Sequence, residues 1–477
     1  MEHPNFTSNV KEQLKANEVS CLRIVEDCLK KIKKGKKLNA FLEIFEKEAI
    51  AKAREIDEEA DRSKLGKLAG MVVGIKDNLC YENHTVSASS KILEGFQSVY
   101  SAHVVKKLLQ EDAIIIGRLN CDEFAMGSSN ENSAYGIVRN PVDPSRVPGG
   151  SSGGAAAAVK MGMCHAALGT DTGGSIRQPA SLCGIIGLKP TYGRVSRNGC
   201  IAYASSFDQI GPMTNTVEDA ALILEVIAGA DENDATTSSQ SVPQYSRKLN
   251  FSGQKKIACL QDCLEHNGLD SEIKGCIREI GNTLKKEGHI VEDVQFPFMD
   301  FLVPAYYVLT TAEASSNLAR YDGIHYGHRS EQADGLEPTY LKSRTEGFGP
   351  EVKRRIMLGT FVLSAGYFDA YYSKAQKVRG IIQRKTLEIL KTYDYILLPT
   401  TPGTAPKIGE NINDPIAMYL EDIFTVQANL TGSPAISLPL GQHSNGLPFG
   451  VQLIGGSMQE DSLFAFSHYL MDNFGFE

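Results

Sequence analysis

The sequence predicts an α/β protein, because short apolar runs typical of strands alternate with longer helical patterns. An apolar run at residues 72–75 precedes a helical pattern at 102–111, and the β-branched run at 113–117 follows it. Two further strands are expected at 395–398 and 435–438. No Pro-, Gly- or Ser-rich linker interrupts the 477 residues, so we expect a single domain over residues 1–477.

Two parts of the chain are expected to be mainly helical. The first covers about residues 1–62, where Ser20 fits a helix N-cap and residues 46–62 are rich in Ala, Glu and Lys. The second covers about residues 270–390. Between them, Thr216 and Asp219 resemble a capping box with Asp in place of Glu, which predicts the start of an apolar helix at 220–228.

Charge and hydropathy restrict the partners. The formal net charge is −8, whereas proteins that grip nucleic acid directly usually present a basic surface, so DNA binding is not expected. The one basic run, residues 33–37, fits lysines at a helix C-terminus followed by a glycine cap, with tRNA contact as the alternative. Residues 1–20 are polar and no apolar run is long enough to span a membrane, so we expect a cytoplasmic protein.

The ten cysteines give no sign of a metal site. None forms a Cys-x-x-Cys pair, and Cys259 and Cys263 lack the further ligands that zinc requires. We expect free thiols and no bound metal. A Cys-Glu-Lys site of the nitrilase type is the alternative, but no cysteine has suitable neighbours.

Two glycine-flanked serine clusters form the candidate active site, GGSSGG at 149–154 and GTDTGGSIRQP at 169–179. Glycines let the backbone approach a ligand closely, so N–H groups are expected to converge on a reacting atom. An apolar segment follows the first cluster directly, which argues against a flexible linker, and neither cluster has the lysine of a phosphate-binding loop. A nucleophile elbow needs a strand before its serine, but residues 140–148 are a proline-rich loop.

A catalytic serine needs a base, and Lys76 is the best candidate. The ten histidines are scattered and lie in no catalytic motif, whereas Lys76 ends the apolar run at 72–75. Burial lowers the pKa of a lysine from about 10.4 toward the ~7 to 8 that suits a general base. The alternative is an ordinary surface lysine after a strand.

These three segments, in this order, resemble the amidase signature family. The resemblance implies a large mixed β-sheet flanked by helices on both faces. It also implies that Ser175 is the nucleophile, that Ser151, after a cis peptide bond, is a bridging serine, and that Lys76 is the base. The oxyanion hole is then formed by the backbone N–H groups of Thr172, Gly173, Gly174 and Ser175.

Further stretches resemble one branch of this family, the A subunits of glutamyl-tRNA(Gln) amidotransferases. They lie at 121–133, 313–323, 352–356 and 359–361. This resemblance implies a glutaminase in which Arg355 binds the α-carboxylate of glutamine and Asp422 its α-ammonium group, with Tyr306 lining the pocket. The neighbours Arg354 and Glu421 stand one residue away from these two, and a surface ion pair is the alternative interpretation of the charged residues.

The same resemblance implies partners. Ammonia would pass to a GatB-like subunit, which uses ATP and Mg²⁺ to convert Glu-tRNA(Gln) to Gln-tRNA(Gln), and a small GatC-like subunit would complete a heterotrimer. This chain would need no cofactor, and the partner would make most of the tRNA contacts. The alternatives are a stand-alone hydrolytic amidase for another carboxamide and a non-catalytic tRNA scaffold. Whether Asp-tRNA(Asn) is also a substrate of the complex is left open by the sequence.

Overall fold

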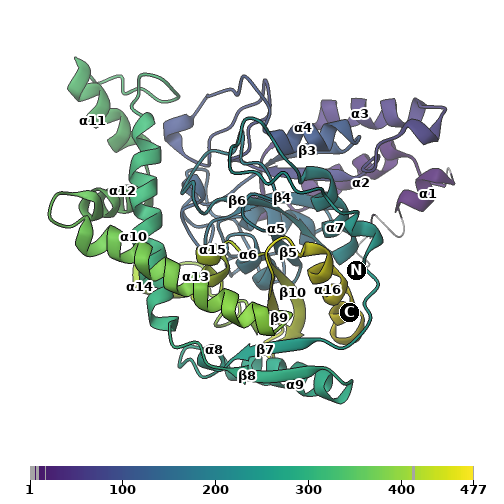
Figure 1. Ribbon diagram of the computed structural model, residues 1–477. Helices are drawn as coiled ribbons and strands as arrows, with labels where there is room; N and C mark the ends of the chain where they lie inside the picture. Colours follow the sequence, from purple (N-terminus) through teal and green to yellow (C-terminus); the bar gives the residue numbers. More distant parts are fainter. Residues whose placement is uncertain (1–5, 7–9, 17, 411–413, 476–477) are drawn as a thin grey trace.

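One mixed β-sheet organises the fold (Figure 1). The computed structural model describes residues 6, 10–16, 18–410 and 414–475. Its 11-stranded sheet has the order β1-β3-β2-β4-β6-β5-β10-β11-β9-β7-β8. The strands are β1 Phe41–Ile44, β2 Val72–Lys76, β3 Ile114–Leu119, β4 Ala166–Asp171, β5 Ile186–Lys189, β6 Gln209–Thr214, β7 Lys256–Leu260, β8 Ile290–Val294, β9 Tyr395–Pro399, β10 Ala435–Gln442 and β11 Pro448–Gly455.

Helices surround this sheet. The α-helices are α1 Lys11–Lys15, α2 Cys21–Lys34, α3 Glu46–Glu58, α4 His103–Gln110, α5 Gly153–Lys160, α6 Arg177–Cys183, α7 Val217–Ile227, α8 Gln261–Leu264, α9 Ser271–Lys286, α10 Met299–Asn317, α11 Leu336–Gly347, α12 Pro350–Leu363, α13 Lys374–Thr392, α14 Pro415–Leu420, α15 Val426–Thr431 and α16 Glu460–Phe474. Short 3₁₀ helices are η2 Lys36–Leu38, η3 Arg62–Lys64, η4 Lys91–Leu93, η5 Glu123–Ala125, η6 Tyr245–Arg247 and η7 Leu318–Arg320, and η8 Asp369–Ser373 is a π-helix.

Both faces of the sheet are covered. Every residue of β2, β4, β6, β9 and β11 is buried. Since successive side chains of a strand point to opposite faces, burial of all of them requires cover on both sides. Helices α6 and α16 both pack on β10 and β11, while α5 and α7 pack on the strands nearer β4. The expected large mixed sheet flanked by helices is therefore confirmed.

The topology brings two parts of the candidate site to one edge of the sheet. Strand β2 lies between β3 and β4 and is parallel to both, with Ile75 opposite Leu168. Lys76 ends β2 and Asp171 ends β4. Because parallel strands end at the same edge of a sheet, Lys76 lies beside the loop that carries Ser175.

The sequence predicted helix starts and strands correctly where a capping residue or an apolar run marked them. The Ser20 hydroxyl accepts from Arg23 N at 3.2 Å, and the Thr216 hydroxyl accepts from Asp219 N at 3.2 Å, so both predicted caps are confirmed. Helix α2 ends within the basic run, where Gly35 N–H donates to the Lys31 carbonyl.

The two segments expected to be mainly helical each contain a strand. Strand β1 interrupts the first, at residues 41–44, and β8 interrupts the second, at 290–294. Both lie at the outer edges of the sheet and are only partly buried. Their pairing with β3 and β7 comes from tertiary contacts, which override weak local preference.

Two further facts concern the part of the chain that the structure describes. No helix there is both long and apolar enough to cross a lipid bilayer. All ten cysteines are free thiols, and eight of them are buried.

Candidate active site

Lys76 is buried among hydroxyl groups. Its Nζ donates to the hydroxyls of Ser151 at 2.7 Å, Thr170 at 2.9 Å and Ser152 at 3.0 Å, and its exposed fraction is 0%. No carboxylate of the described residues forms an ion pair with it. Burial lowers the pKa of the Lys76 ammonium group, although nearby thiols and carboxyls act in the opposite direction. This arrangement favours a neutral amine that can accept a proton from a serine.

The two predicted serines lie on neighbouring segments. The peptide bond between Gly150 and Ser151 is cis, as the resemblance implies. Ser152 N–H donates to the Ser175 carbonyl at 3.1 Å, which holds the two serine clusters together. Ser151 is fully buried, whereas Ser175 retains 8% of its surface, and among the described residues the Ser175 hydroxyl has no hydrogen-bond partner. Ser175 is therefore the hydroxyl of this pair that a substrate can reach.

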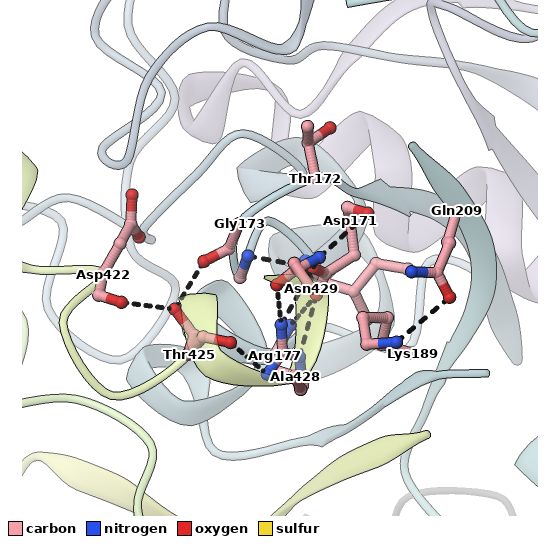
Figure 2. Close-up of polar contacts among 12 residues, drawn as sticks. Asp171, Thr172, Gly173, Arg177, Lys189, Gln209, Asp422, Thr425, Ala428 and Asn429 are labelled. Atoms are coloured by element: carbon pink, nitrogen blue, oxygen red, sulfur yellow. Dashed lines mark hydrogen bonds and ion pairs between the residues drawn. The ribbon is translucent and has the colours of Figure 1, made fainter. Parts of the chain in front are cut away.

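A buried ion pair fixes the loop that carries Ser175 (Figure 2). Asp171 Oδ1 accepts from Arg177 Nη2 at 3.0 Å, and Asp171 Oδ2 accepts from Arg177 Nε at 3.0 Å. Arg177 also donates to the Thr425 carbonyl and to Asn429 Oδ1. Burial raises the pKa of Asp171, but the Arg177 guanidinium more than offsets this and the pKa is about 2. The pair ties the loop at 171–177 to the segment around α15.

The backbone N–H groups of this loop, which are expected to face the oxyanion, differ in whether they already have an acceptor. Gly174 N–H donates to Asp171 Oδ1 at 2.9 Å, so this amide already has an acceptor in the free chain, and its place in the oxyanion hole stays a prediction. The N–H groups of Thr172, Gly173 and Ser175 have no acceptor among the described residues. These three amides remain available to stabilise a developing negative charge.

Two close approaches explain why the loop needs consecutive glycines. A Cβ atom on Gly173 would lie 2.4 Å from the Tyr306 ring, and one on Gly174 would lie 2.2 Å from Thr425 Oγ1. Gly174 also has φ of +136°, which side chains rarely allow. Tyr306, predicted to line the pocket, is therefore in contact with the loop that carries Ser175.

Arg355 lies in a cage of tyrosines at the inner face of α12. Its Nε donates to Glu351 Oε1 at 2.8 Å and its Nη1 to the Tyr203 hydroxyl at 2.8 Å. The rings of Tyr203, Tyr307 and Tyr419 lie 5.2 to 5.6 Å from its guanidinium carbon. Arg355 is 2% exposed, whereas the side chain of its neighbour Arg354 is 41% exposed, so the structure directs Arg355 inward.

Asp422 lies close to this cage, in the turn between α14 and α15. Its Oδ2 accepts from the Ser128 hydroxyl at 2.7 Å and from the Tyr307 hydroxyl at 3.5 Å. Thr425 Oγ1 bridges the Asp422 and Gly173 carbonyls, at 3.0 and 2.6 Å, as Figure 2 shows. Burial raises the pKa of the Asp422 carboxyl to about 7.

A cavity of about 580 Å³ forms a vestibule beside these groups. Ser128 and Ser129 line one side, Glu351 and Arg354 on α12 another, and Glu421 a third. Ser175 does not line the cavity, but Gln178 Nε2 donates to the Ser128 carbonyl at 2.7 Å, so the vestibule lies next to the serine loop. Within the described residues, no group of three or more His, Cys, Asp or Glu side chains is placed to hold a metal ion.

Sequence reasoning missed four residues of this site: Ser128, Tyr203, Tyr307 and Glu351. Ser128 lies in the stretch 121–133 that carried the resemblance, and Tyr307 and Glu351 are close in sequence to predicted residues. Tyr203 lies 152 residues from Arg355, and no local pattern marks it.

Comparison with known proteins agrees with this geometry. A model of the amidase family matches residues 23–464. This chain belongs to the amidase family. The resemblance inferred from the sequence is thereby confirmed, while the catalytic roles of individual residues in this amidase stay predictions.

Among curated amidase relatives, the chain is 47% identical over 465 residues to a glutamyl-tRNA(Gln) amidotransferase A subunit of Chlorobium limicola, covering 97% of this chain and 98% of the relative. It is 50% identical over 457 residues to the corresponding A subunit of Clostridium botulinum strain Okra, covering 95% and 94%.

Comparison with solved structures gives the same family. The glutamyl-tRNA(Gln) amidotransferase A subunit of Thermotoga maritima superimposes with a TM-score of 0.78 at 44% identity, covering 95% of this chain and 92% of that one. A peptide amidase from Stenotrophomonas maltophilia reaches 0.79 at 28% identity, covering 98% and 97%.

Proposed function

We propose that this amidase is the glutamine-hydrolysing A subunit of a tRNA-dependent amidotransferase. The observation that carries the proposal is near-full-length identity of 47 to 50% to A subunits of glutamyl-tRNA(Gln) amidotransferases. The buried Lys76 with its serine partners supports an amide-hydrolysing site in the same chain. Its reaction converts glutamine to glutamate and ammonia, and a partner uses the ammonia.

The first step of the proposed chemistry rests on the hydrogen bond between Lys76 and Ser151, and the family resemblance supplies the step from Ser175 to Ser151. Neutral Lys76 takes a proton from Ser151, and Ser151 takes one from Ser175 as the Ser175 oxygen attacks the amide carbon. The free amides of Thr172, Gly173 and Ser175 stabilise the oxyanion, each donor contributing about 3 kcal/mol to the transition state. The proton returns through Ser151 to the leaving nitrogen, the C–N bond breaks and ammonia departs. Water then cleaves the ester between Ser175 and the glutamyl group.

The ends of glutamine are held by opposite charges. Arg355 pairs with the α-carboxylate, since a guanidinium fork matches a carboxylate, and ionised Asp422 pairs with the α-ammonium group. Tyr307 lies between them, with its ring 5.2 Å from the Arg355 guanidinium carbon and its hydroxyl 3.5 Å from Asp422. Their burial restricts the site to a small amino acid with both charges.

The partners follow from the resemblance. A GatB-like subunit uses ATP and Mg²⁺ to activate the glutamyl group on Glu-tRNA(Gln), and a GatC-like subunit completes the heterotrimer. This chain holds no cofactor of its own, and the partner makes most of the tRNA contacts, consistent with the acidic charge of −8. The complex works in the cytoplasm, where aminoacyl-tRNA is used.

Dependence on the partners tests this function against a stand-alone amidase. Ammonia made without an acceptor is lost to solvent, so hydrolysis is expected to be slow in the isolated chain. Adding both partner subunits, ATP and Glu-tRNA(Gln) is expected to raise the glutaminase rate by roughly 5- to 150-fold, which corresponds to a typical coupling free energy. Ammonia release measured with and without each component gives the answer. Full activity of the isolated chain, unchanged by partners or tRNA, would assign a hydrolytic amidase instead.

If Asp422 binds the α-ammonium group of glutamine, replacing it is expected to weaken glutamine binding. Asp422→Asn removes the carboxylate that faces the α-ammonium group, so KM for glutamine is expected to rise more than kcat falls. Glu421→Gln is the matched control, because Glu421 lines the vestibule one residue away. Steady-state kinetics of both variants decide the assignment: a larger rise in KM for Glu421→Gln would transfer the role to that residue.

The same carboxyl predicts a pH effect. The pKa of Asp422 is about 7 in the free chain, and only the ionised form attracts the ammonium group. Glutamine capture is therefore expected to weaken as pH falls through about 7 and to strengthen above it. The pH profile of kcat/KM, which reports groups of the free enzyme, measures this. Asp422→Asn is expected to lose this step, and a step that persists unchanged in the variant belongs to another group.

A further inference from the structure

Helices α11 and α12 present an exposed apolar surface at the left edge of the molecule in Figure 1. We call it the α11–α12 face, and it consists of Leu336, Tyr340, Leu341, Met357, Leu358 and Phe361. Leu341 and Met357 are each 67% exposed. Next to it, the rings of Tyr367 and Tyr371 lie 4.4 and 5.6 Å from that of Phe361, and both are also exposed. Contiguous apolar surfaces of this kind mark interaction sites.

A groove runs between the two helices. A cavity of about 530 Å³ is lined by Tyr340, Leu341 and Phe348 on one side and by Ile356 and Met357 on the other. Phe348 and Lys353 line both this groove and the vestibule of the active site. An occupant of the groove would therefore lie next to the entrance of the site.

Helix α12 has a buried inner face and an outer face with exposed apolar residues. Its inner face, with Val352, Arg355 and Val362, is buried against the body of the protein. Its outer face, with Met357 and Phe361, faces solvent. Exposed apolar side chains on the outer face of a helix whose inner face is already buried are free to contact another protein.

The charge of this region differs from that of the whole chain. Residues 336–363, which contain α11 and α12, have five Lys and Arg and three Asp and Glu, a net charge of +2, against −8 for the full sequence. A second copy of the chain would bring two like-charged surfaces together in a symmetric dimer. A partner protein whose apolar surface is bordered by carboxylates would instead complement the positive charge of this region.

Nucleic acid is a poorer match than a protein. The Arg344 guanidinium donates to the carbonyls of Leu318 and Tyr321, and Arg379 donates to the carbonyls of Leu430 and Ser206. The Arg344 and Arg379 side chains are therefore already used by the protein itself, and a net charge of +2 over α11 and α12 is far from the dense basic surface that phosphate binding needs. Exposed Leu, Met, Phe and Tyr side chains are instead typical of protein interfaces.

We propose that the α11–α12 face binds a partner subunit of the amidotransferase, through an apolar surface of the partner that is bordered by carboxylates. This inference rests on the proposed function, because it takes the partner to be another subunit of that complex. The partner then contacts the outer face of α12, while the inner face of the same helix carries Arg355 and Glu351. Binding on one face of α12 thereby sets the position of the glutamine-binding arginine on the other.

The test uses the full chain and the two partner subunits expressed together from the same organism. Met357→Glu combined with Phe361→Glu places two carboxylates on the face, and we expect the Kd for the partners to rise at least ~30-fold, as for loss of a binding hot spot. Ile44→Glu is the control, because Ile44 on β1 is 40% exposed, close to the 42% of Phe361. It should bind like the wild type. Titration calorimetry measures the Kd, and thermal melting checks that each variant is folded.

Leu341→Glu, on α11, provides an independent variant if the double variant does not fold, and is expected to weaken binding in the same way. Wild-type affinity of the folded double variant or of Leu341→Glu would overturn the proposal. A change in the self-association of the chain would assign the face to a second copy, and a loss of tRNA binding by the isolated chain would assign it to nucleic acid. If the wild-type complex forms but hydrolyses no glutamine, the proposed function fails while the surface stands.

Discussion

Replacing Ser175 with alanine is expected to reduce glutamine hydrolysis by about a millionfold, as for other nucleophile deletions. Ser175 lies on the segment that Ser152 N–H contacts and retains 8% of its surface, and without its oxygen no acyl-enzyme can form. Pre-steady-state ammonia release from the assembled complex measures the loss. The wild-type chain is also expected to yield a glutamyl ester on Ser175 after rapid acid quenching, detectable by peptide mass spectrometry.

Ser152→Ala is the matched control for this variant. Ser152 also receives a hydrogen bond from Lys76, at 3.0 Å, but it is fully buried and its hydroxyl donates to the Thr170 carbonyl. Its loss is expected to be far smaller than that of Ser175→Ala. Appreciable activity in Ser175→Ala, or an equal loss in Ser152→Ala, would remove Ser175 from the role of nucleophile.

Replacing Lys76 with alanine is expected to slow turnover by at least the ~10² to 10⁴-fold typical of a general base. Lys76→Arg is not expected to restore it, because a guanidinium does not release its proton at working pH. The base acts in its neutral form, so activity should fall as pH is lowered below the pKa of Lys76, which burial places below that of a free lysine. An active arginine variant would refute the role of Lys76 as base.

Lys189 gives a stringent control for that experiment. It is also fully buried, and burial lowers its pKa to about 7, but it donates to the Pro190 carbonyl and to Gln209 Oε1 rather than to a serine. Lys189→Met should therefore keep the pH dependence of hydrolysis, whatever it does to stability. A loss of the same pH limb in Lys189→Met would mean that buried lysines affect the rate without acting as the base.

The sequence was informative where function depends on short motifs. Lys76, Ser151 and Ser175 lie on three local patterns, and the folded chain brings the first two within 2.7 Å of each other. Strand ends were also predictable, because a short apolar run that ends on a charge marks one edge of a sheet. Each of these motifs depends only on residues close in sequence, and folding of the chain then brings the motifs together.

Other parts of the site depend on contacts between distant residues. Arg177 binds Asn429, 252 residues away, and Asp422 binds Ser128, 294 residues away, so neither pair leaves a local pattern. The use of Gly174 N–H by Asp171 was also missed, because a glycine-rich motif does not tell which amides turn toward the substrate. The edge strand β1 has four residues, of which three are partly buried and one is exposed, and its pairing with β3 decides its structure.

The central claim is that Ser175 of this chain supplies ammonia from glutamine to a partner that modifies tRNA. Gln-tRNA(Gln) formation by the complex that carries Ser175→Ala, with either glutamine or ammonium chloride as nitrogen donor, tests it most directly. We expect almost no product with glutamine and product at the wild-type rate with ammonium chloride, because only the ammonia source is removed. Product from glutamine in the Ser175→Ala complex, or none from ammonium chloride in the wild-type complex, would contradict it.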